Sequence, residues 1–468
     1  MLQLTSIKYV YLLGIGGIGM SALARYFKAS GKHVCGYDKT ATTLTNALEQ
    51  EGISVHFTDA VDQLPHFLSG AGLNSEAMVI YTPAIPKNHL EYNHLLACGY
   101  KIWKRSEVLG LITRDSTTIA VAGTHGKTTT STMIAHILRY NKINCTAFLG
   151  GISKNYETNL LLSDPSSEKE VVIVEADEFD RSFLTLHPDI SVITSLDADH
   201  LDIYGNQEAM VESYSQFASQ VKANGTLICK TGLQLTGNVV PAFNYAIDIA
   251  ASYRAFNVRV QNHNYVFDLE TPAQTYHDFV LTWPGRHNVE NATGAIAACL
   301  TFGISIDGIK EALETFHGVK RRFDYQLREP EIIFIDDYAH HPEELKATIL
   351  SVKELYPEKK VLGIFQPHLY TRTRDFADGF GTSLSHLDEL ILMEIYPARE
   401  LPIPGVTSAM IAGKVTGGKT QICSRNEITE KVLDSSASVV LTLGAGDIDE
   451  LVPEIKHALE NKYKKQSA

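Results

Sequence analysis

The sequence lacks the features that would place a protein outside the cell, in a membrane or on nucleic acid. Its six cysteines are scattered and form no C-x-x-C pair, so we expect free thiols in a reducing compartment. No apolar run reaches membrane-spanning length, and the N-terminus has no charged-then-apolar signal segment. The 54 acidic and 41 basic residues are interspersed and give a net charge of −13, which argues against a broad basic surface for nucleic acid. We therefore expect a cytoplasmic protein with no membrane insertion and no nucleic-acid partner.

The length and the residue pattern predict a multidomain α/β enzyme. A chain of 468 residues has room for about three domains, and an apolar content of 44% is sufficient for ordinary cores. Short apolar strands alternate with helical stretches from end to end, which predicts parallel sheets. The sequence leaves the oligomeric state open between a monomer and a homodimer.

The most informative segment is G-T-H-G-K-T at residues 123–128. It follows the apolar strand Thr117–Ala122 and precedes a helical stretch over residues 131–140. A glycine-rich turn at a helix N-terminus presents backbone N–H groups to an anion, while Lys127 suits phosphate oxygens and Thr128 suits Mg²⁺. Val121 stands where the longer phosphate-loop motif has its first glycine, and this short form is typical of one group of amide-forming ligases. The segment predicts ATP or GTP binding.

A second glycine-rich turn, G-I-G-G-I-G at residues 14–19, follows the strand Tyr9–Leu13 and opens a helix. A further strand over residues 34–37 ends at Asp38. This arrangement matches the dinucleotide fingerprint and predicts a diphosphate site, although a tight turn without a ligand is the alternative. The strand over residues 78–81 ends in Thr82 before two prolines, which fits a ligand site or a simple turn equally well. We expect a linker over residues 104–113.

Acidic segments follow two strands downstream of the phosphate loop. A strand over residues 171–174 ends in Glu175, where a carboxylate beside a phosphate loop would hold a metal ion. The alternative is a solvated acidic turn. A strand over residues 190–194 leads to His200 among three aspartates. His200 would bind a second cation or orient a phosphate, unless it is structural.

Paired amides and paired arginines follow further along the chain. Asn288 and Asn291 are three residues apart at a helix start, where two carboxamides could recognise both edges of adenine. Helix capping is the alternative and explains one of them. The adjacent Arg321 and Arg322 suit a polyphosphate, but a solvated basic turn is equally consistent.

Three strands in the last third of the chain end in polar residues. The strand over residues 332–335 leads to D-D-Y-A-H-H, Val361–Phe365 leads to Q-P-H-L-Y-T-R-T-R-D, and Val439–Leu443 leads to G-A-G-D. Such strand ends meet at the carboxyl edge of a parallel sheet and predict a site there. The adjacent His340 and His341 point apart, so a zinc site is not expected. A G-x-S-x-G nucleophile motif is also missing from the sequence.

Together these segments resemble the Mur ligase family, and within it the branch that adds the first amino acid. The matching segments run in one order over nearly the whole chain: residues 14–20, 123–128, 175–180, 197–202, 285–292, 337–342 and 366–375. The resemblance implies a three-domain α/β fold. The domains would be an N-terminal Rossmann-like UDP-substrate domain (1–107), a central phosphate-loop ATP domain (108–318) and a C-terminal Rossmann-like domain (319–468) that closes over ATP and the amino acid.

The activity implied by the resemblance is ATP-dependent joining of L-alanine to the lactyl carboxylate of UDP-N-acetylmuramate through an acyl phosphate, in peptidoglycan precursor synthesis. The small-molecule partners would be UDP-N-acetylmuramate, L-alanine and ATP. Two Mg²⁺ ions are implied, with Mn²⁺ as a substitute.

Site residues are also implied by the resemblance. ATP would contact Gly123, Thr124, Gly126, Lys127, Thr128, Thr129, Asn288, Asn291, Arg322 and Asp337. The UDP-substrate would contact Gly16, Gly17, Gly19, Asp38, Thr82 and His125. The metal ions would be held by Thr128, Glu175 and His200, and the amino acid by Tyr338, His340 and Arg372. The catalytic set would be Lys127, His200, His340 and Arg372, with His340 accepting the proton of the alanine ammonium.

Two departures and two alternatives accompany this resemblance. Leu369 stands where many members have an arginine, which leaves the alanine carboxylate to Arg372 or Arg374. Residues 205–221 contain no lysine, so we expect no carbamylated lysine. The near alternative is the recycling ligase that adds a murein tripeptide to UDP-N-acetylmuramate. The distant one is a nicotinamide-dependent oxidoreductase, which rests on the first glycine motif and Asp38.

Overall fold

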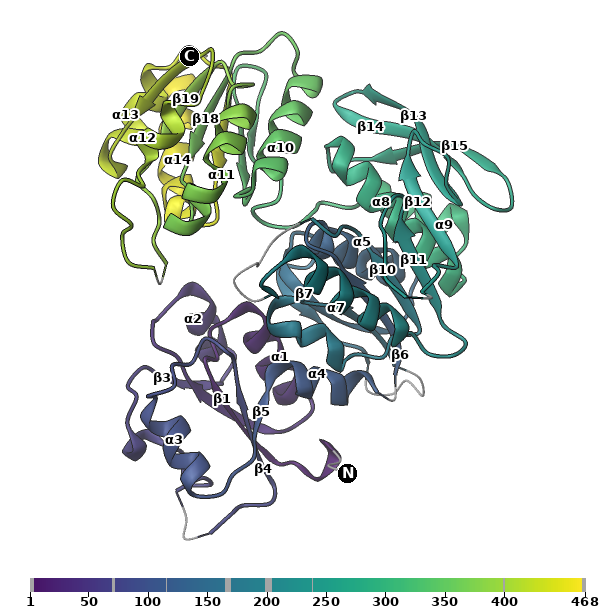
Figure 1. Ribbon diagram of the computed structural model, residues 1–468, viewed down its shortest axis with the longest axis vertical. Helices are drawn as coiled ribbons and strands as arrows, with labels where there is room; N and C mark the ends of the chain where they lie inside the picture. The colour runs from purple at the N-terminus through teal and green to yellow at the C-terminus, as the bar shows by residue number, and fades with distance from the viewer. Residues whose placement is uncertain are drawn as a thin grey trace. The chain divides into compact units, whose positions relative to one another are not determined.

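A computed structural model of the protein describes residues 4–69, 72–114, 116–164, 170–197, 204–237, 239–398 and 400–464. These residues form three β-sheets with flanking helices (Figure 1), which confirms the predicted α/β class. The chain divides into two compact units. The first contains residues 1–256, 269–276 and 290–315, and the second contains residues 257–268, 277–289 and 316–468.

The first sheet is parallel and has the strand order β3-β2-β1-β4-β5. Its strands are β1 (Tyr9–Leu13), β2 (His33–Tyr37), β3 (Ser54–His56), β4 (Ala77–Tyr81) and β5 (Ile102–Lys104). The associated helices are α1 (Ile18–Ala29), α2 (Thr43–Gln50), α3 (Leu90–Ala97) and α4 (Arg105–Thr113). The direction of the strand order reverses between β1 and β4, which is where α/β sheets bind ligands beyond their strand ends.

The second sheet has ten strands in the order β15-β14-β13-β12-β11-β10-β6-β9-β7-β8. The strands are β6 (Thr117–Ala122), β7 (Cys145–Ser153), β8 (Thr158–Leu161), β9 (Val171–Glu175), β10 (Ile190–Ile193), β11 (Thr226–Lys230), β12 (Phe243–Ile247), β13 (Tyr253–Gln261), β14 (Asn264–Glu270) and β15 (Thr275–Leu281). The helices are α5 (Lys127–Tyr140), α7 (Gln207–Ser219), α8 (Arg286–Phe302) and α9 (Ile306–Glu314). Strand β6 lies between β9 and β10 and pairs in parallel with both, so three strand ends meet at the phosphate loop.

Helix α1 of the first sheet packs on β7 and β8 of the second within the first unit. The Asn159 amide donates to the Ile18 carbonyl at 2.6 Å and accepts from Arg25 at 2.8 Å. The linker predicted over residues 104–113 is wrong, because α4 occupies that segment. Its residues Val108 and Ile112 are buried in the core that α1 shares with the central sheet.

The third sheet belongs to the second unit and has the order β16-β17-β21-β18-β19-β20. Its strands are β16 (Asp324–Arg328), β17 (Ile333–Asp337), β18 (Val361–Phe365), β19 (Glu389–Leu392), β20 (Lys419–Ile422) and β21 (Val439–Leu443). The helices are α10 (Pro342–Leu355), α11 (Tyr370–Leu384), α12 (Ser408–Ala412), α13 (Ile428–Asp434) and α14 (Val452–Lys464). All strands run in parallel except β16, which is antiparallel to β17. The carboxyl ends of β17, β18 and β21 therefore lie at one edge, as predicted.

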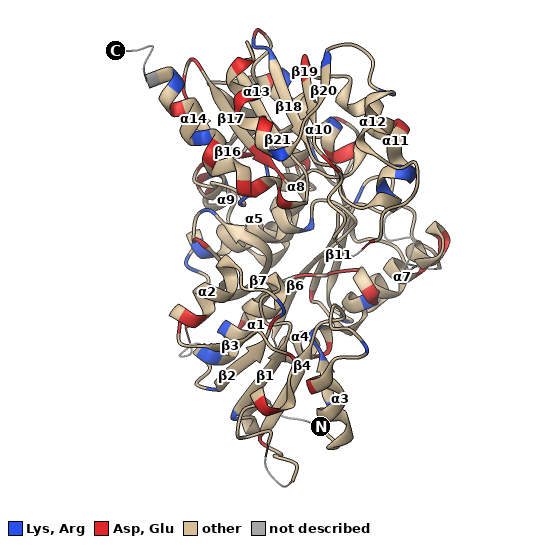
Figure 2. Cartoon of the chain, turned by 90° about the vertical axis from the view of Figure 1, so that its left-hand side faces the viewer, with Lys and Arg blue, Asp and Glu red and all other residues tan. Residues whose placement is uncertain are grey.

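Basic and acidic residues are interspersed along the chain (Figure 2). Within the described residues, no helix is both long enough and apolar enough to cross a membrane. The six cysteines are described and are all free thiols.

Candidate functional site

The phosphate loop joins β6 to α5 and requires glycine at two positions. Gly123 has φ +136°, and a Cβ there would lie 2.1 Å from the Thr194 hydroxyl oxygen. Gly126 has φ +82°, and a Cβ there would lie 2.5 Å from Oδ1 of Asn291. Residues after β10 and from α8 therefore leave no room for a side chain at these two positions. The positive φ angles are also unfavourable for any residue other than glycine.

The segment after β10 holds the loop in shape through hydroxyl contacts. The Ser195 hydroxyl accepts the His125 N–H at 2.7 Å and lies 2.8 Å from the Thr124 hydroxyl. Thr124 in turn accepts the Asp197 N–H at 3.1 Å. Nε2 of His125 lies 3.8 Å from the Asp197 carboxylate. Asp197, the first residue of the matching segment 197–202, therefore lies against the phosphate loop, whereas His200 lies outside the described residues.

Lys127, the first residue of α5, turns toward the acidic turn after β9. Its Nζ lies 2.8 Å from the Glu178 carboxylate and donates to the Gly123 carbonyl at 2.6 Å. Burial alone would lower the pKa of the Lys127 ammonium, but the charges of Glu178 and Glu175 raise it above its usual value. Lys127 is therefore a cation at any pH near neutrality.

The donor set at this strand end suits a hard divalent cation. Glu175 is the last residue of β9 and pairs with Val121 of the neighbouring strand β6, which leads into the phosphate loop. Thr128 is in the first turn of α5 and is buried. No group of three or more His, Cys, Asp or Glu side chains within the described ranges is arranged to hold a metal. Mg²⁺ usually takes one or two protein oxygens and completes its shell with water and substrate phosphates, so a carboxylate and a hydroxyl beside a phosphate loop fit it.

Asn288 and Asn291 both belong to α8, which begins at Arg286 after Gly285 with φ +116°. Asn288 is buried, and its amide donates to the Pro284 carbonyl at 2.7 Å. Asn291, in the first unit, lies beside Gly126 of the phosphate loop. The two amides thus have different surroundings. A shared role at adenine stays a prediction.

The N-terminal glycine turn is shaped by Asp38 and Thr82. The Gly16 N–H donates to the Asp38 carboxylate at 2.7 Å, and a Cβ on Gly16 would lie 2.8 Å from that carboxylate. A Cβ on Gly14, which has φ +85°, would lie 2.5 Å from the Thr82 methyl group. Gly17 caps α1, and a Cβ there would come no closer than 3.6 Å to the atoms around it. The open side of this turn is therefore at Gly17 and the α1 N-terminus.

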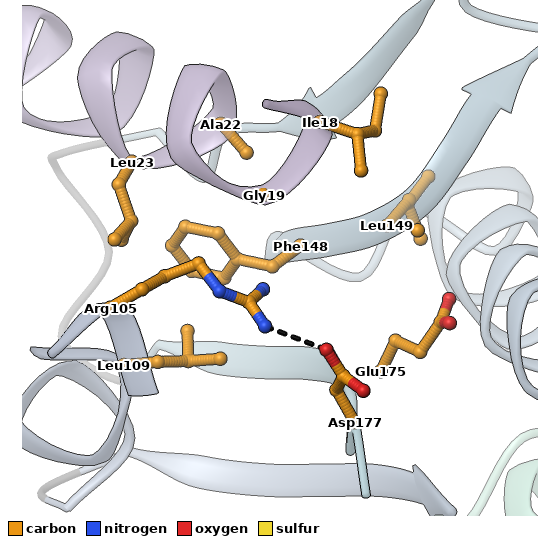
Figure 3. A pocket seen from close by; sticks show the side chains of 11 residues that line it. Ile18, Gly19, Ala22, Leu23, Arg105, Leu109, Phe148, Leu149, Glu175 and Asp177 are labelled. Atoms are coloured by element: carbon orange, nitrogen blue, oxygen red, sulfur yellow. Dashed lines mark hydrogen bonds and ion pairs between the residues drawn. The ribbon is translucent and has the colours of Figure 1, made fainter. Parts of the chain in front are cut away.

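Gly19 makes room for Arg105, the first residue of α4, because a Cβ on Gly19 would lie 2.3 Å from a guanidinium nitrogen. Arg105 is held by Asp177 at 2.8 Å. Both side chains line a pocket of about 170 Å³, with Glu175 beside Asp177 (Figure 3). The apolar part of the lining consists of Ile18, Ala22, Leu23, Leu109, Phe148 and Leu149. This pocket connects the α1 N-terminus with the acidic strand end near the phosphate loop.

The second unit contains a separate cluster at the carboxyl edge of its sheet. Arg322 lies over the Tyr338 ring at 5.1 Å and 3.8 Å from the Glu344 carboxylate. Nδ1 of His340 lies 3.0 Å from the Tyr338 carbonyl and 3.3 Å from Glu344. The His340 ring is 6.1 Å from that of His368. The structure thus brings three of the predicted residues, Arg322, Tyr338 and His340, together.

The Asp337 carboxylate is hydrogen-bonded to the backbone of its own unit. Its carboxylate accepts the N–H of Phe323 at 2.6 Å and of Ala339 at 2.8 Å. Burial raises its pKa to about 6, against the opposing charge of Arg322. These bonds fix the junction before β16 to the end of β17. Its predicted ATP contact is untested.

Burial dominates the titration of the histidines in this cluster. Burial lowers the pKa of His340 to about 4. The charge of Glu344 opposes this lowering, and the charge of Arg372 adds to it. The pKa of His368 is also lowered to about 4 by burial and then by Arg372. Both imidazoles are therefore neutral near pH 7.

Arg372 and Arg374 are distinguished by their surroundings. Arg372 is close enough to His340 and His368 for its charge to lower the pKa of both. Arg374 is exposed and pairs with its neighbour Asp375 at 2.7 Å. Of the two arginines that the sequence left open for the alanine carboxylate, Arg372 is the one whose charge acts on His340 and His368. The preceding Leu369 has φ +68°, a strained conformation for this residue type.

Sequence reasoning missed several polar residues of both clusters. Glu178, which pairs with Lys127, stands three residues after Glu175, and the prediction of a metal site at that strand end names Glu175 alone. Arg105 was placed in a linker. Glu344 caps α10 by accepting the backbone N–H groups of His340 and His341 at 3.0 and 3.3 Å, and a glutamate three residues after an N-cap is a capping signal that could have identified it.

The fold and these clusters define a class: an α/β protein with two glycine-rich strand–turn–helix motifs, of which the central one carries a lysine paired with a glutamate after β9. Comparison with protein families narrows this class. The Mur ligase family catalytic domain matches residues 9–117, the Mur ligase middle domain matches 121–299, and the Mur ligase glutamate ligase domain matches 321–446.

Similar proteins extend over nearly the whole chain. It is 48% identical over 460 residues to the UDP-N-acetylmuramate–L-alanine ligase of Flavobacterium johnsoniae, covering 98% of this chain and 99% of the relative. The same identity holds over 469 residues for the enzyme of that name from Parabacteroides distasonis, covering 99% and 100%. The crystal structure of the UDP-N-acetylmuramate–alanine ligase of Thermotoga maritima matches with TM-score 0.82 and 27% identity, covering 97% and 99%. A murein peptide ligase from Psychrobacter arcticus matches with TM-score 0.68, 22% identity and the same coverage, which shows the fold alone. The chain belongs to the Mur ligase family.

Proposed function

We propose that this protein joins L-alanine to the lactyl carboxylate of UDP-N-acetylmuramate, with conversion of ATP to ADP and phosphate, in peptidoglycan precursor synthesis. The observation that carries the proposal is the full-length similarity to ligases of that name at 45–48% identity. The pocket between α1 and β7 supports it, because its lining extends from the diphosphate-type turn at Gly19 to Glu175 at the end of β9.

The chemistry requires activation of a poor acyl donor. The lactyl carboxylate oxygen attacks the γ-phosphorus of ATP, the bond to the β-phosphate oxygen breaks, and ADP leaves. Lys127 would neutralise the charge that spreads over the transferred group, as the loop N–H groups would also do. Thr128 and Glu175 would hold Mg²⁺, which would supply further charge neutralisation and phosphate orientation.

The second step is attack of the neutral alanine amine on the acyl phosphate, which expels phosphate and releases one proton. We propose that Arg372 binds the alanine carboxylate as a bidentate partner, near Tyr338 and His340. His340 would accept the proton. With a pKa of about 4 it is a weak base. Burial is the main cause of that low pKa, and the charges of Arg372 and Arg322 add to it. The role therefore requires the negative charge of bound substrates to raise the pKa of His340.

The remaining assignments are part of the proposal. Gly16, Gly17, Gly19, Asp38, Thr82 and His125 would form the UDP-substrate site. His200 would join Thr128 and Glu175 in holding two Mg²⁺ ions, replaceable by Mn²⁺. The domain boundaries 107/108 and 318/319, a cytoplasmic location and a monomeric or homodimeric state also stay proposals. The first boundary falls inside α4.

The test is phosphate release from ATP with Mg²⁺ and UDP-N-acetylmuramate, with and without L-alanine. We expect release that requires both substrates. Glycine should replace alanine poorly but measurably, because one methyl group is worth about 1–3 kcal/mol of discrimination. Release that ignores alanine and requires the tripeptide L-alanyl-γ-D-glutamyl-diaminopimelate would transfer the assignment to the recycling ligase. No release with either acceptor would contradict the ligase assignment.

The two alternatives are not favoured. The murein peptide ligase structures match with TM-scores of 0.68 and 0.59, below the 0.82 of the alanine ligase structure. The curated relatives at 45–48% identity are alanine ligases. An oxidoreductase would leave the Lys127 loop and the C-terminal cluster without a role, and it does not fit the Mur ligase family.

A further inference from the structure

The Lys127 ammonium is fully engaged with protein acceptors. Its Nζ lies 2.6 Å from the Gly123 carbonyl, 3.4 Å from the Thr124 carbonyl and 2.8 Å from the Glu178 carboxylate. A lysine ammonium has three N–H donors, and three acceptors surround it. A nucleotide phosphate can bind Lys127 only by replacing at least one of them.

Glu178 is fixed in place by its surroundings. Its side chain is 2% exposed, and its carbonyl accepts the Tyr204 hydroxyl at 2.6 Å and the Arg181 N–H at 2.9 Å. A carboxylate this deeply buried requires a cation beside it, since an uncompensated buried charge is strongly unfavourable. Lys127 is that cation. The pair thus spans from the phosphate loop to the turn after β9.

We infer that Glu178 is a positioning residue that takes the place of the nucleotide phosphate on Lys127, so that it holds the loop closed without nucleotide and competes with nucleotide for the lysine. ATP binding would move the ammonium from Glu178 to the phosphates, and product release would return it. The inference rests on the proposed nucleotide site and adds a residue that opposes binding there.

The same turn offers a matched control. Asp180 is two residues from Glu178 and pairs with Lys104 at 2.8 Å, but both side chains are about two-fifths exposed. Asp180→Asn removes one negative charge from the same turn without touching Lys127. Surface pairs of this kind contribute little, so this variant measures the general effect of charge on nucleotide affinity.

The experiment compares Glu178→Gln with Asp180→Asn in two measurements. One is ATP and ADP affinity by calorimetry in Mg²⁺; the other is thermal melting without nucleotide. For Glu178→Gln we expect about 5- to 20-fold tighter nucleotide binding, because the competing charge is gone, together with a lower melting temperature of the nucleotide-free protein. For Asp180→Asn we expect less than about a twofold change in affinity.

A purely structural role for Glu178 would lower stability and weaken nucleotide binding together, and that result would overturn the inference. Unchanged affinity with a reduced kcat would also overturn it, because Glu178 would then act in the chemical step. If Glu178→Gln does not fold, Glu178→Asp and Lys127→Gln, alone and combined, provide a double-mutant cycle of nucleotide-free stability. No coupling between the two positions would contradict the pair. A wild-type protein that binds no ATP would instead defeat the proposed function, while the coupling would still be measurable.

Discussion

The two glycine-rich turns of the first unit share a strand–turn–helix topology but handle charge differently. The turn after β1 gives its Gly16 N–H to Asp38 and leaves Gly17 and the α1 N-terminus open. The turn after β6 carries Lys127, which is paired with a buried carboxylate. The first turn is thus suited to hold an anion by backbone dipoles alone. The second adds a lysine cation to the same geometry, which is what phosphoryl transfer requires and simple binding does not.

Removal of the Lys127 cation is the strongest test of this difference between the two turns. Lys127→Met should lower kcat for phosphate release by about 10³-fold or more, the size of effect expected for a cation on the transferred phosphoryl group. Affinity for UDP-N-acetylmuramate, measured by calorimetry without ATP, should stay within about twofold, because the N-terminal turn does not depend on Lys127.

Lys222→Met is the matched control for Lys127→Met. Lys222 lies in the same unit, pairs with Asp189 at 2.8 Å and donates to the Ser116 carbonyl at 3.1 Å. Its removal should lower stability but not the turnover of the folded enzyme. Equal loss of turnover in both variants would show that the effect of Lys127 comes from folding.

Glycine substitutions give a second, smaller test of the same comparison. Gly126→Ala places a Cβ at φ +82° and 2.5 Å from Oδ1 of Asn291. We expect it to reduce the free energy of unfolding by about 1–2 kcal/mol and to weaken ATP binding. Gly17→Ala has ordinary backbone angles, φ −67° and ψ 146°, and its Cβ would make only ordinary van der Waals contacts, the nearest at 3.6 Å, so stability should change by less than about 0.5 kcal/mol.

The informative measurement for Gly17→Ala is therefore affinity rather than stability. If a diphosphate approaches the backbone at Gly17, the added methyl group should weaken UDP-N-acetylmuramate binding while denaturant unfolding stays unchanged. Unchanged affinity would remove Gly17 from the diphosphate site and would indicate that the open turn is a packing feature.

The two turns also show what sequence can predict. Both were located to the residue, because a glycine-rich strand–turn–helix depends on local backbone conformation. The partners of the turns were not predicted, since Glu178 reaches Lys127 only through the pairing of β6 with β9. Similarly, the ATP contact of Asp337 is an expectation from the family resemblance, and that of Asn288 rests on its pairing with Asn291 and on the same resemblance. The structure shows that each also makes local hydrogen bonds to the backbone.

Helix α4 is an error of a different kind, because the signal was present. Val108, Leu109 and Ile112 are buried on one face of α4, at the spacing of an amphipathic helix, and Glu107 accepts the Lys104 N–H at 2.7 Å as a capping residue. The segment between two recognised motifs was treated as a connection. It is instead the element that brings Arg105 onto Gly19, and so it shapes the first turn.

The smallest expected effect concerns pH and the strand that leads into the first turn. In β1, the Tyr11 hydroxyl donates to the fully buried Glu91. Burial raises the pKa of Glu91 to about 7 from an ordinary value of 4.5. Between these values the folded protein holds the proton more tightly than the unfolded chain. The contribution of Glu91 to stability therefore increases as the pH falls from 8 to 5. The pKa values of the nearby His56 and His89 are lowered by burial, and these groups act in the opposite direction below pH 6.5.

Glu91→Gln isolates the Glu91 contribution from that of the histidines. Melting temperatures of the wild type and the variant should be compared at pH 5, 6, 7 and 8, with Glu76→Gln, which removes an exposed partner of Lys8, as the control. As the pH falls from 8 to 5, the melting temperature of the wild type should rise relative to that of Glu91→Gln by on the order of 5 °C. The difference in melting temperature between the wild type and Glu76→Gln should not change with pH. The central turn has no equivalent, because both buried charges on Lys127 and Glu178 are compensated by each other. A constant difference between the wild type and Glu91→Gln would mean that Glu91 is ionised throughout, and that the first sheet, like the central one, carries a compensated charge.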